Sequence, residues 1–112
     1  MRESILLVLS TAPGEDEAKK IARTLIEKKL AACCNIINKV RSVYLWQDSI
    51  KETEEYLLLI KTTQKNYDQL EKEIKMIHSY SVPEIIATKI ESGSSAYVDW
   101  IVESTEKQGS EK

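Results

Sequence analysis

The feature that most constrains this chain is an unbroken apolar run in its middle. Residues Tyr56 to Ile60 read Tyr-Leu-Leu-Leu-Ile, which is far shorter than the roughly 18 to 20 residues of a membrane span. We interpret the run as a strand, and because successive side chains of a strand point to opposite faces, both of its faces must be buried. A chain of 112 residues cannot easily cover both faces by itself. We therefore expect a second copy of the chain to supply the missing cover.

Two apolar stripes at helical spacing lie on either side of that strand. From Glu15 to Lys29 apolar residues recur every three or four positions, with acidic residues first and lysines last, as the helix dipole favours. A second stripe begins at Tyr67 and should end near His78, because Pro83 biases its predecessor away from helical backbone. Two amphipathic helices are therefore expected.

The rest of the chain predicts the other strands and a last helix. Including the central run, strands are expected at residues 4–11, 32–46, 54–62 and 84–91. The second strand should bend near Asn38 and Lys39, and we interpret residues 47–51 as a turn. Ser94 or Ser95 is placed to cap a final helix. The residues expected on the buried edge of that helix are Tyr97, Trp100 and Ile101.

This order predicts an α+β fold of the ferredoxin-like βαββαβ plan with an added C-terminal helix. The sheet should be antiparallel, with the helices on one side only. We expect a single domain over residues 1–112, in which 106–112 form a frayed polar tail. Because the helices shield only one face of the sheet, this fold again predicts an oligomer.

Charge and cysteine content narrow the class of protein. Lys and Arg number 16 and Asp and Glu 18, so the net charge of −2 gives no basic footprint for nucleic acid. A single Arg2, followed by Glu3, does not make a secretory signal, and no membrane partner is expected. Cys33 and Cys34 are adjacent, which is poor geometry for a disulfide and fits free thiols in a reducing compartment. We expect a cytoplasmic protein.

Several activities hosted by this fold lack their residues here. The first and third strands carry too few aromatic residues for RNA recognition, and the loop after the first strand has neither a Cys-x-x-Cys pair nor the arginine of an acylphosphatase. The three glycines form no phosphate-binding loop. Catalysis by a pair of Cys33 and His78 is conceivable, but a small core cysteine and a structural histidine are the commoner roles. The composition alone predicts no enzyme.

A metal site within one chain meets a shortage of ligands. One imidazole and no spaced cysteine pair exclude a closed zinc site in a single chain. Symmetry changes this count, because copies of His78 around an axis, or ligands borrowed across an interface, can form a site for copper(II) or another divalent ion. The companion ligands would be Glu84, Cys33 and Tyr80.

An ordered set of short motifs spans almost the whole chain and resembles the CutA divalent-cation tolerance family. The motifs are Leu30-Ala31-Ala32-Cys33 with Asn35, Ser42-Val43-Tyr44 with Trp46, Glu54, Lys61-Thr62, His78-Ser79-Tyr80-Ser81-Val82-Pro83-Glu84, and Tyr97 with Trp100. The resemblance implies a ferredoxin-like homotrimer whose long second and third strands extend onto neighbouring subunits. It also implies an architecture similar to PII signalling proteins.

The resemblance implies a non-catalytic, copper(II)-binding protein of divalent-cation tolerance. Its candidate metal ligands here are Cys33, in the family's Ala-Ala-Cys segment, and His78, in its His-Pro-Tyr segment, whose Pro is Ser79 in this chain. Some members carry a further His and a further Cys where this chain has Ile77 and Ser10.

Two further groups of residues have candidate roles. Lys61, Tyr80 and Glu84 either hold the turn before the last strand or line an intersubunit cleft. Tyr44, Trp46 and Trp100 are expected to anchor interface and core. The alternative function is a PII-like adaptor that binds a small ligand at intersubunit clefts and signals to an unidentified protein partner.

Overall fold

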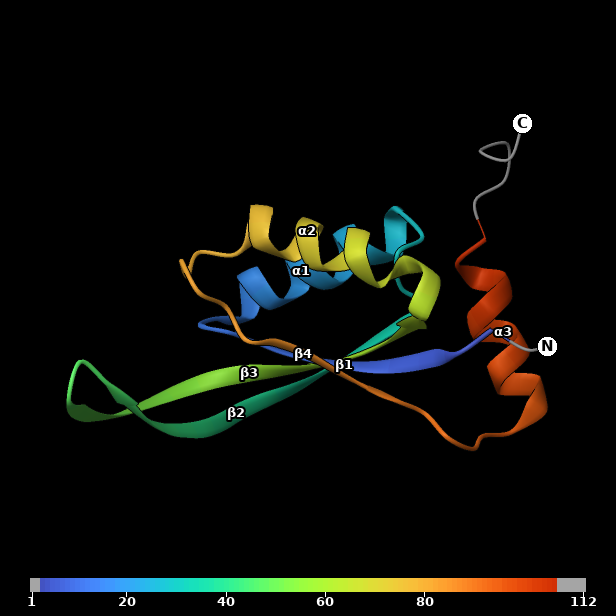
Figure 1. Cartoon of the computed structure of the whole chain (residues 1–112). Coiled ribbons are helices and arrows are strands. Elements are labelled where there is room, and N and C mark those ends of the chain that lie inside the picture. Colours follow the sequence, from blue (N-terminus) through green and yellow to red (C-terminus); the bar gives the residue numbers. More distant parts are fainter. Residues whose placement is uncertain (1–2, 107–112) are drawn as a thin grey trace.

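Four strands and three helices follow the expected order. The computed structural model describes residues 3–106 (Figure 1). Its elements are β1 (Ile5–Ala12), α1 (Glu15–Glu27), β2 (Cys33–Trp46), β3 (Ser49–Thr63), a 3-10 turn (Gln64–Asn66), α2 (Tyr67–Ile77), β4 (Ile85–Lys89) and α3 (Ser95–Ser104). The strands form one antiparallel sheet in the order β2, β3, β1, β4. The predicted α+β class and antiparallel sheet are confirmed, whereas the single-domain organisation over 1–112 stays a prediction.

Helices α1 and α2 lie side by side on one face of the sheet (Figure 1). The sheet contributes every second residue of its two central strands to the core beneath them, which is the period that a strand dictates. These residues are Leu6, Val8, Leu58 and Ile60. The helices contribute Ile21, Leu25, Leu70 and Ile74, all fully buried. The expected amphipathic stripes therefore build this core.

The opposite face of the sheet is the one expected to lack cover, and we call it the open face. Register places the other residues of β1 and β3 on it, and Leu7, Leu9, Leu57 and Leu59 are only half-buried there. Helix α3 covers just one end of this face, where Val98 and Ile101 pack on Ile5. The expectation that the helices lie on one side of the sheet is met by α1 and α2 but was wrong for α3, which packs against the end of the opposite face.

Strands β2 and β3 continue past the body of the protein as a hairpin arm (Figure 1). The expected turn at 47–51 was too long, because only Gln47 and Asp48 form the turn and β3 begins at Ser49 instead of residue 54. Both turn residues have positive φ, 50° and 65°, as a two-residue hairpin turn that matches strand twist requires. The predicted bend in β2 is confirmed by the positive φ of Lys39 and a register shift between Ile37 and Val40.

The arm makes the molecule elongated. The chain extends over 49 × 29 × 22 Å, and its radius of gyration is 15.0 Å, against about 13 Å for a compact domain of this length. A two-stranded ribbon of this kind is marginally stable alone in water, so an arm that leaves the body needs further contacts.

Helix α3 buries a different edge from the one expected. Val98 and Ile101 are buried, whereas Tyr97 and Trp100 are 44% and 43% exposed, so the predicted edge was wrong at both aromatic residues. The edge of α3 that packs against the end of the sheet starts at Val98, one position after the expected Tyr97. Ser94 holds the N-cap position, but its side chain makes no capping hydrogen bond.

The expected tail lies outside the described residues except for Glu106. None of the helices within residues 3–106 is both long enough and apolar enough to cross a membrane.

Candidate functional site

His78 is buried where α2 ends, and both of its ring nitrogens are engaged. Its Nε2 lies 2.6 Å from the carbonyl oxygen of Thr11, and its Nδ1 accepts a hydrogen bond of 3.0 Å from the backbone N–H of Tyr80. A carbonyl can only accept, so Nε2 must carry the proton and donate it. This neutral imidazole has no ring nitrogen left for a metal ion in the fold as it stands.

A network of carboxylates surrounds His78 and ties the loop after α2 to the rest of the fold. Glu17 on α1 accepts hydrogen bonds from the backbone N–H and hydroxyl of Ser79, at 2.8 and 3.0 Å, and lies 3.3 Å from His78 Nδ1. The buried Glu55 accepts from the hydroxyls of Tyr80, at 2.8 Å, and Ser42, at 2.6 Å. Because Ser42 and Glu55 stand where the arm leaves the body, Tyr80 fastens the loop to the root of the arm.

This network predicts how stability changes at alkaline pH. Burial first, and then the hydrogen bond to Glu55, raise the pKa of Tyr80 from 10.0 to about 12. Since the folded-state pKa is raised, the hydroxyl's contribution is fully present below pH 10 and is lost as the pH rises from 10 towards 12. We expect Tyr80→Phe to cost about 1 kcal/mol of unfolding free energy at pH 8.

Urea unfolding of both proteins from pH 8 to 11.5 tests this expectation. The difference in unfolding free energy between the wild type and Tyr80→Phe should narrow above pH 10, because only the wild type can lose the hydrogen bond from Tyr80 to Glu55. Tyr56→Phe serves as the control, since Tyr56 is half-buried but does not donate to Glu55. A gap for Tyr80→Phe that stays constant across this pH range would contradict the assignment.

Cys33 and Lys61 meet near the other end of the sheet, on the open face. They pair across β2 and β3, and Lys61 Nζ donates to Asn35 Oδ1, which also accepts from Cys33 Sγ at 3.7 Å. Tyr97 on α3 lies near this thiol, because burial first, and then the neighbouring Cys33, raise the pKa of the Tyr97 hydroxyl. We call Cys33, Asn35, Lys61 and Tyr97 the open-face polar cluster.

Cys34 faces the other way. It packs against the core beneath the helices, and burial, followed by the neighbouring Cys33, raises the pKa of its thiol to about 12. At neutral pH this thiol stays protonated and is therefore a poor nucleophile and metal ligand. Both cysteines are free, as expected from their adjacency.

The structure does not bring the two candidate metal ligands together. Cys33 is level with Leu7 of β1, whereas His78 binds the carbonyl of Thr11, four residues or about 13 Å further along that strand. Throughout residues 3–106 no three His, Cys, Asp or Glu side chains come close enough to hold a metal ion. The described part of a single chain therefore does not offer a copper site.

The other candidates fall into two separate regions. Tyr80 stacks on His78, with ring centroids 4.8 Å apart, and Glu84 is exposed just before β4. Lys61 stands six residues, or about 20 Å, from Glu55 along β3, so Lys61 and Tyr80 do not line one cleft within a chain. The expected anchors are exposed: Tyr44 and Trp46 on the arm, and Trp100, paired with Tyr97 at 5.5 Å, on α3.

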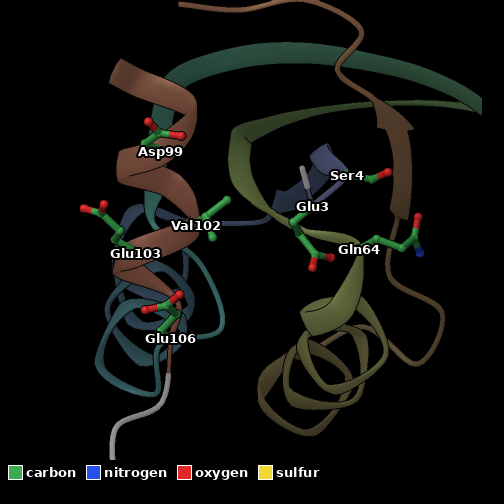
Figure 2. Close-up of a pocket in the computed structure, with 7 residues that line it drawn as sticks. All are labelled: Glu3, Ser4, Gln64, Asp99, Val102, Glu103 and Glu106. Carbon is green, nitrogen blue, oxygen red and sulfur yellow. The ribbon is translucent and has the colours of Figure 1, made fainter. Parts of the chain in front are cut away.

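An acidic hollow of about 770 Å³ lies between α3 and the start of β1 (Figure 2). Four carboxylates line it, and one of them, Glu3, accepts a hydrogen bond from the backbone N–H of Lys65. The remaining carboxylates belong to Asp99, Glu103 and Glu106. The hollow is open and strongly negative, which disfavours an anionic ligand there.

Sequence reasoning missed four residues of these networks: Glu17, Glu55, Asn35 and Tyr97 in its site role. Glu17 was assigned only to the acidic start of a helix, and Asn35 only to a motif. A signal existed for Glu55, the charged residue that immediately precedes the apolar run of a central strand. Such a carboxylate is buried only where donors reach it, as Ser42 and Tyr80 do here.

Comparison with known proteins gives a consistent result. The family described as CutA1 divalent ion tolerance protein matches residues 6–104. The chain is 44% identical over 99 residues to the divalent-cation tolerance protein CutA of Thermus thermophilus, covering 88% of this chain and 96% of that protein. It is 39% identical over 100 residues to the chloroplastic protein CutA of Arabidopsis thaliana, covering 89% of this chain but only 55% of that protein.

Solved structures agree with these matches. The crystal structure of CutA1 from Oryza sativa superposes with a TM-score of 0.92 at 36% identity, covering 96% of this chain and 98% of that chain. The similarity therefore includes both the sequence and the whole described fold.

Proposed function

Because the chain belongs to the CutA1 divalent ion tolerance protein family, we propose that it acts in divalent-cation tolerance as a cytoplasmic homotrimer that binds copper(II) or another divalent cation and catalyses no reaction. The Thermus thermophilus relative is named for divalent-cation tolerance, and neither of the two relatives is named for an enzymatic activity. The two free thiols support a reducing compartment.

The observation that carries the proposed self-assembly is the apolar surface left uncovered in one chain. The arm exposes large apolar side chains, among them Trp46 at 50% and Ile50 at 75%, and it extends away from the body (Figure 1). The open face adds four half-buried leucines next to the arm. Monomeric soluble proteins rarely expose so much contiguous apolar surface, and further copies of the same chain are its simplest cover.

A metal site in this proposal must draw on more than one copy. One chain offers no cluster of three ligands within its described residues, and both ring nitrogens of His78 are occupied. Cys33 is the better candidate of the two, because it lies on the face that a second copy would cover. His78 could contribute only after losing its bonds to Thr11 and Tyr80.

Nucleophilic catalysis has little support in this geometry. A cysteine nucleophile needs a base within hydrogen-bond reach, whereas His78 lies about 13 Å along the sheet from Cys33, and its Nδ1 already accepts a hydrogen bond from Tyr80. A non-catalytic role is therefore the proposal that fits the site.

Copper(II) titration under argon, followed by calorimetry and electron paramagnetic resonance, tests the proposal. We expect saturable binding that Cys33→Ser weakens more than tenfold and that Cys34→Ser leaves unchanged, because the two thiols face opposite sides of the sheet. Nickel(II) provides a redox-inert comparison. Equal binding by His78→Ala would remove His78 from the site.

The same titration distinguishes the proposed metal binding from the alternative function. A wild-type protein that binds no divalent cation, while forming a particle of three copies, would contradict metal binding and favour a PII-like adaptor with a small ligand between subunits. Light scattering that finds a single-chain mass at micromolar concentration would contradict both assignments.

A further inference from the structure

Where β1, β2 and β3 pair side by side, over residues 5–11, 33–37 and 57–63, the open face carries one formally charged residue among apolar and neutral polar ones. Lys61 stands between Leu7 on β1 and Cys33 on β2, and the next side chain on the same face of β3 is Leu59. Lys61 is already half-buried in the single chain. An ammonium at this position is unusual, because lysine is almost never buried without a partner.

The hydrogen-bonding capacity of Lys61 is only partly used. An ammonium has three N–H donors, and Asn35 Oδ1 accepts one of them. The ion pairs within residues 3–106 join carboxylates to other lysines, to Arg41 or to His78. None of them includes Lys61, so no described Asp or Glu neutralises it. The cluster around it adds donors, namely the side-chain N–H groups of Asn35 and the hydroxyl of Tyr97, whereas the single S–H of Cys33 is already donated to Asn35 Oδ1.

Covering the open face makes this arrangement costly unless an acceptor arrives. Burying an unpaired ammonium costs several kcal/mol, which removes much of what an apolar interface gains. The described part of the chain holds no carboxylate in place to compensate. The acceptor must therefore come from outside the chain, and the acidic hollow beside α3 is not its source, because its carboxylates line a separate pocket.

We propose that Lys61 and Asn35, with Tyr97 beside them, form one chain's half of an oxyanion site that is completed where a second copy covers the open face. The site takes a carboxylate or phosphate group, held by a charge-assisted bond from Lys61 and by the neutral donors around it. This inference rests on the proposed self-assembly. The site lies beside Cys33, the candidate copper ligand, so the two occupants compete, because the positive charge of Lys61 attracts anions and repels cations.

The oxyanion has two sources that share this chemistry: a small free anion, or a carboxylate of the second copy. Calorimetry and thermal unfolding of the assembled wild type, with inorganic phosphate or citrate against chloride at equal ionic strength, distinguish them. The variants are Lys61→Met, the charge-preserving Lys61→Arg, and the control Lys89→Met. Lys89 lies on β4 and faces the helix side of the sheet.

Phosphate or citrate binding that Lys61→Met weakens more than tenfold, and that Lys61→Arg and Lys89→Met largely retain, supports a free anion. Absence of anion binding, together with a more than tenfold weaker self-association of Lys61→Met but not of Lys89→Met, supports a carboxylate of the second copy. Lys61→Met that matches the wild type in both anion binding and association would overturn the inference while leaving the proposed function intact. A wild type of single-chain mass would overturn both.

Discussion

Replacing Leu58 with alanine should lower the free energy of unfolding by about 2–5 kcal/mol. Leu58 is fully buried in the centre of β3, where it packs beneath α1 and α2. Removing its side chain both loses buried apolar surface and leaves a cavity between two rigid layers, and the surrounding helices can close only part of it. For a domain of this size that is a large share of the total stability.

Urea unfolding followed by circular dichroism measures the effect, at several chain concentrations because association adds to apparent stability. Val82→Ala is the matched control: it also removes an aliphatic side chain, but from a loop where Val82 is 75% exposed. It should change the unfolding free energy by less than about 0.5 kcal/mol. A loss below about 1 kcal/mol for Leu58→Ala would mean that β3 does not form the centre of the core.

The parts of the fold that follow from local periodicity could be predicted from the sequence. The stripes of α1 and α2 carry a helical repeat, and the short length of the apolar run in β3 favours a strand. Their order then leaves few topologies, and the antiparallel sheet with α1 and α2 on one face is the result. The Leu58 prediction needs nothing beyond this level of reasoning.

The arm and α3 could not be predicted as well, for two different physical reasons. The turn at Gln47 and Asp48 places non-glycine residues at positive φ, so the usual glycine that marks a tight hairpin is missing. In α3, Tyr97 and Trp100 are the largest apolar side chains, yet the helix presents Val98 and Ile101 to the sheet. Side-chain size predicts how much area a residue can bury, but the docking of the helix decides which edge meets the sheet.

The site was harder to predict because its contacts join distant parts of the chain. His78 meets Thr11 and Glu17, which are 67 and 61 positions earlier, and Tyr80 meets Glu55 across the α2 layer. Residue type had suggested a metal ligand in His78. The packing of α2 against β1 instead gives its imidazole one acceptor and one donor, which is the role of a structural histidine.

Lys61 presents the opposite case. Its side chain was recognised from the sequence as a candidate for a cleft, but only the register of β3 shows that it lies in an apolar sheet face beside Cys33 and away from Tyr80. One carboxylate network near His78 and one ammonium near Cys33 therefore occupy separate regions of the same sheet. A ligand that contacts both regions would have to bridge two copies of the chain.

Leu57→Asp should separate folding from assembly. Leu57 lies on the open face, half-buried in the single chain, with Thr11 and Ile37 as its neighbours across the sheet. A carboxylate there is still partly hydrated in the isolated chain, so it costs less than in a face that a second copy covers. If a second copy covers this face, the same carboxylate is desolvated without a partner, at several kcal/mol for each interface. Lys61, four residues away along β3, is too far to neutralise it.

We expect the variant to keep the wild-type circular dichroism spectrum while its dissociation constant for self-association rises more than a thousandfold, which corresponds to about 4 kcal/mol. Sedimentation or light scattering across a concentration series measures the shift. Gln69→Glu adds the same charge to the exposed side of α2 and should leave association unchanged. A Leu57→Asp protein that assembles as tightly as the wild type would place the interface elsewhere, since no tightly packed apolar contact accommodates an unpaired carboxylate at that cost.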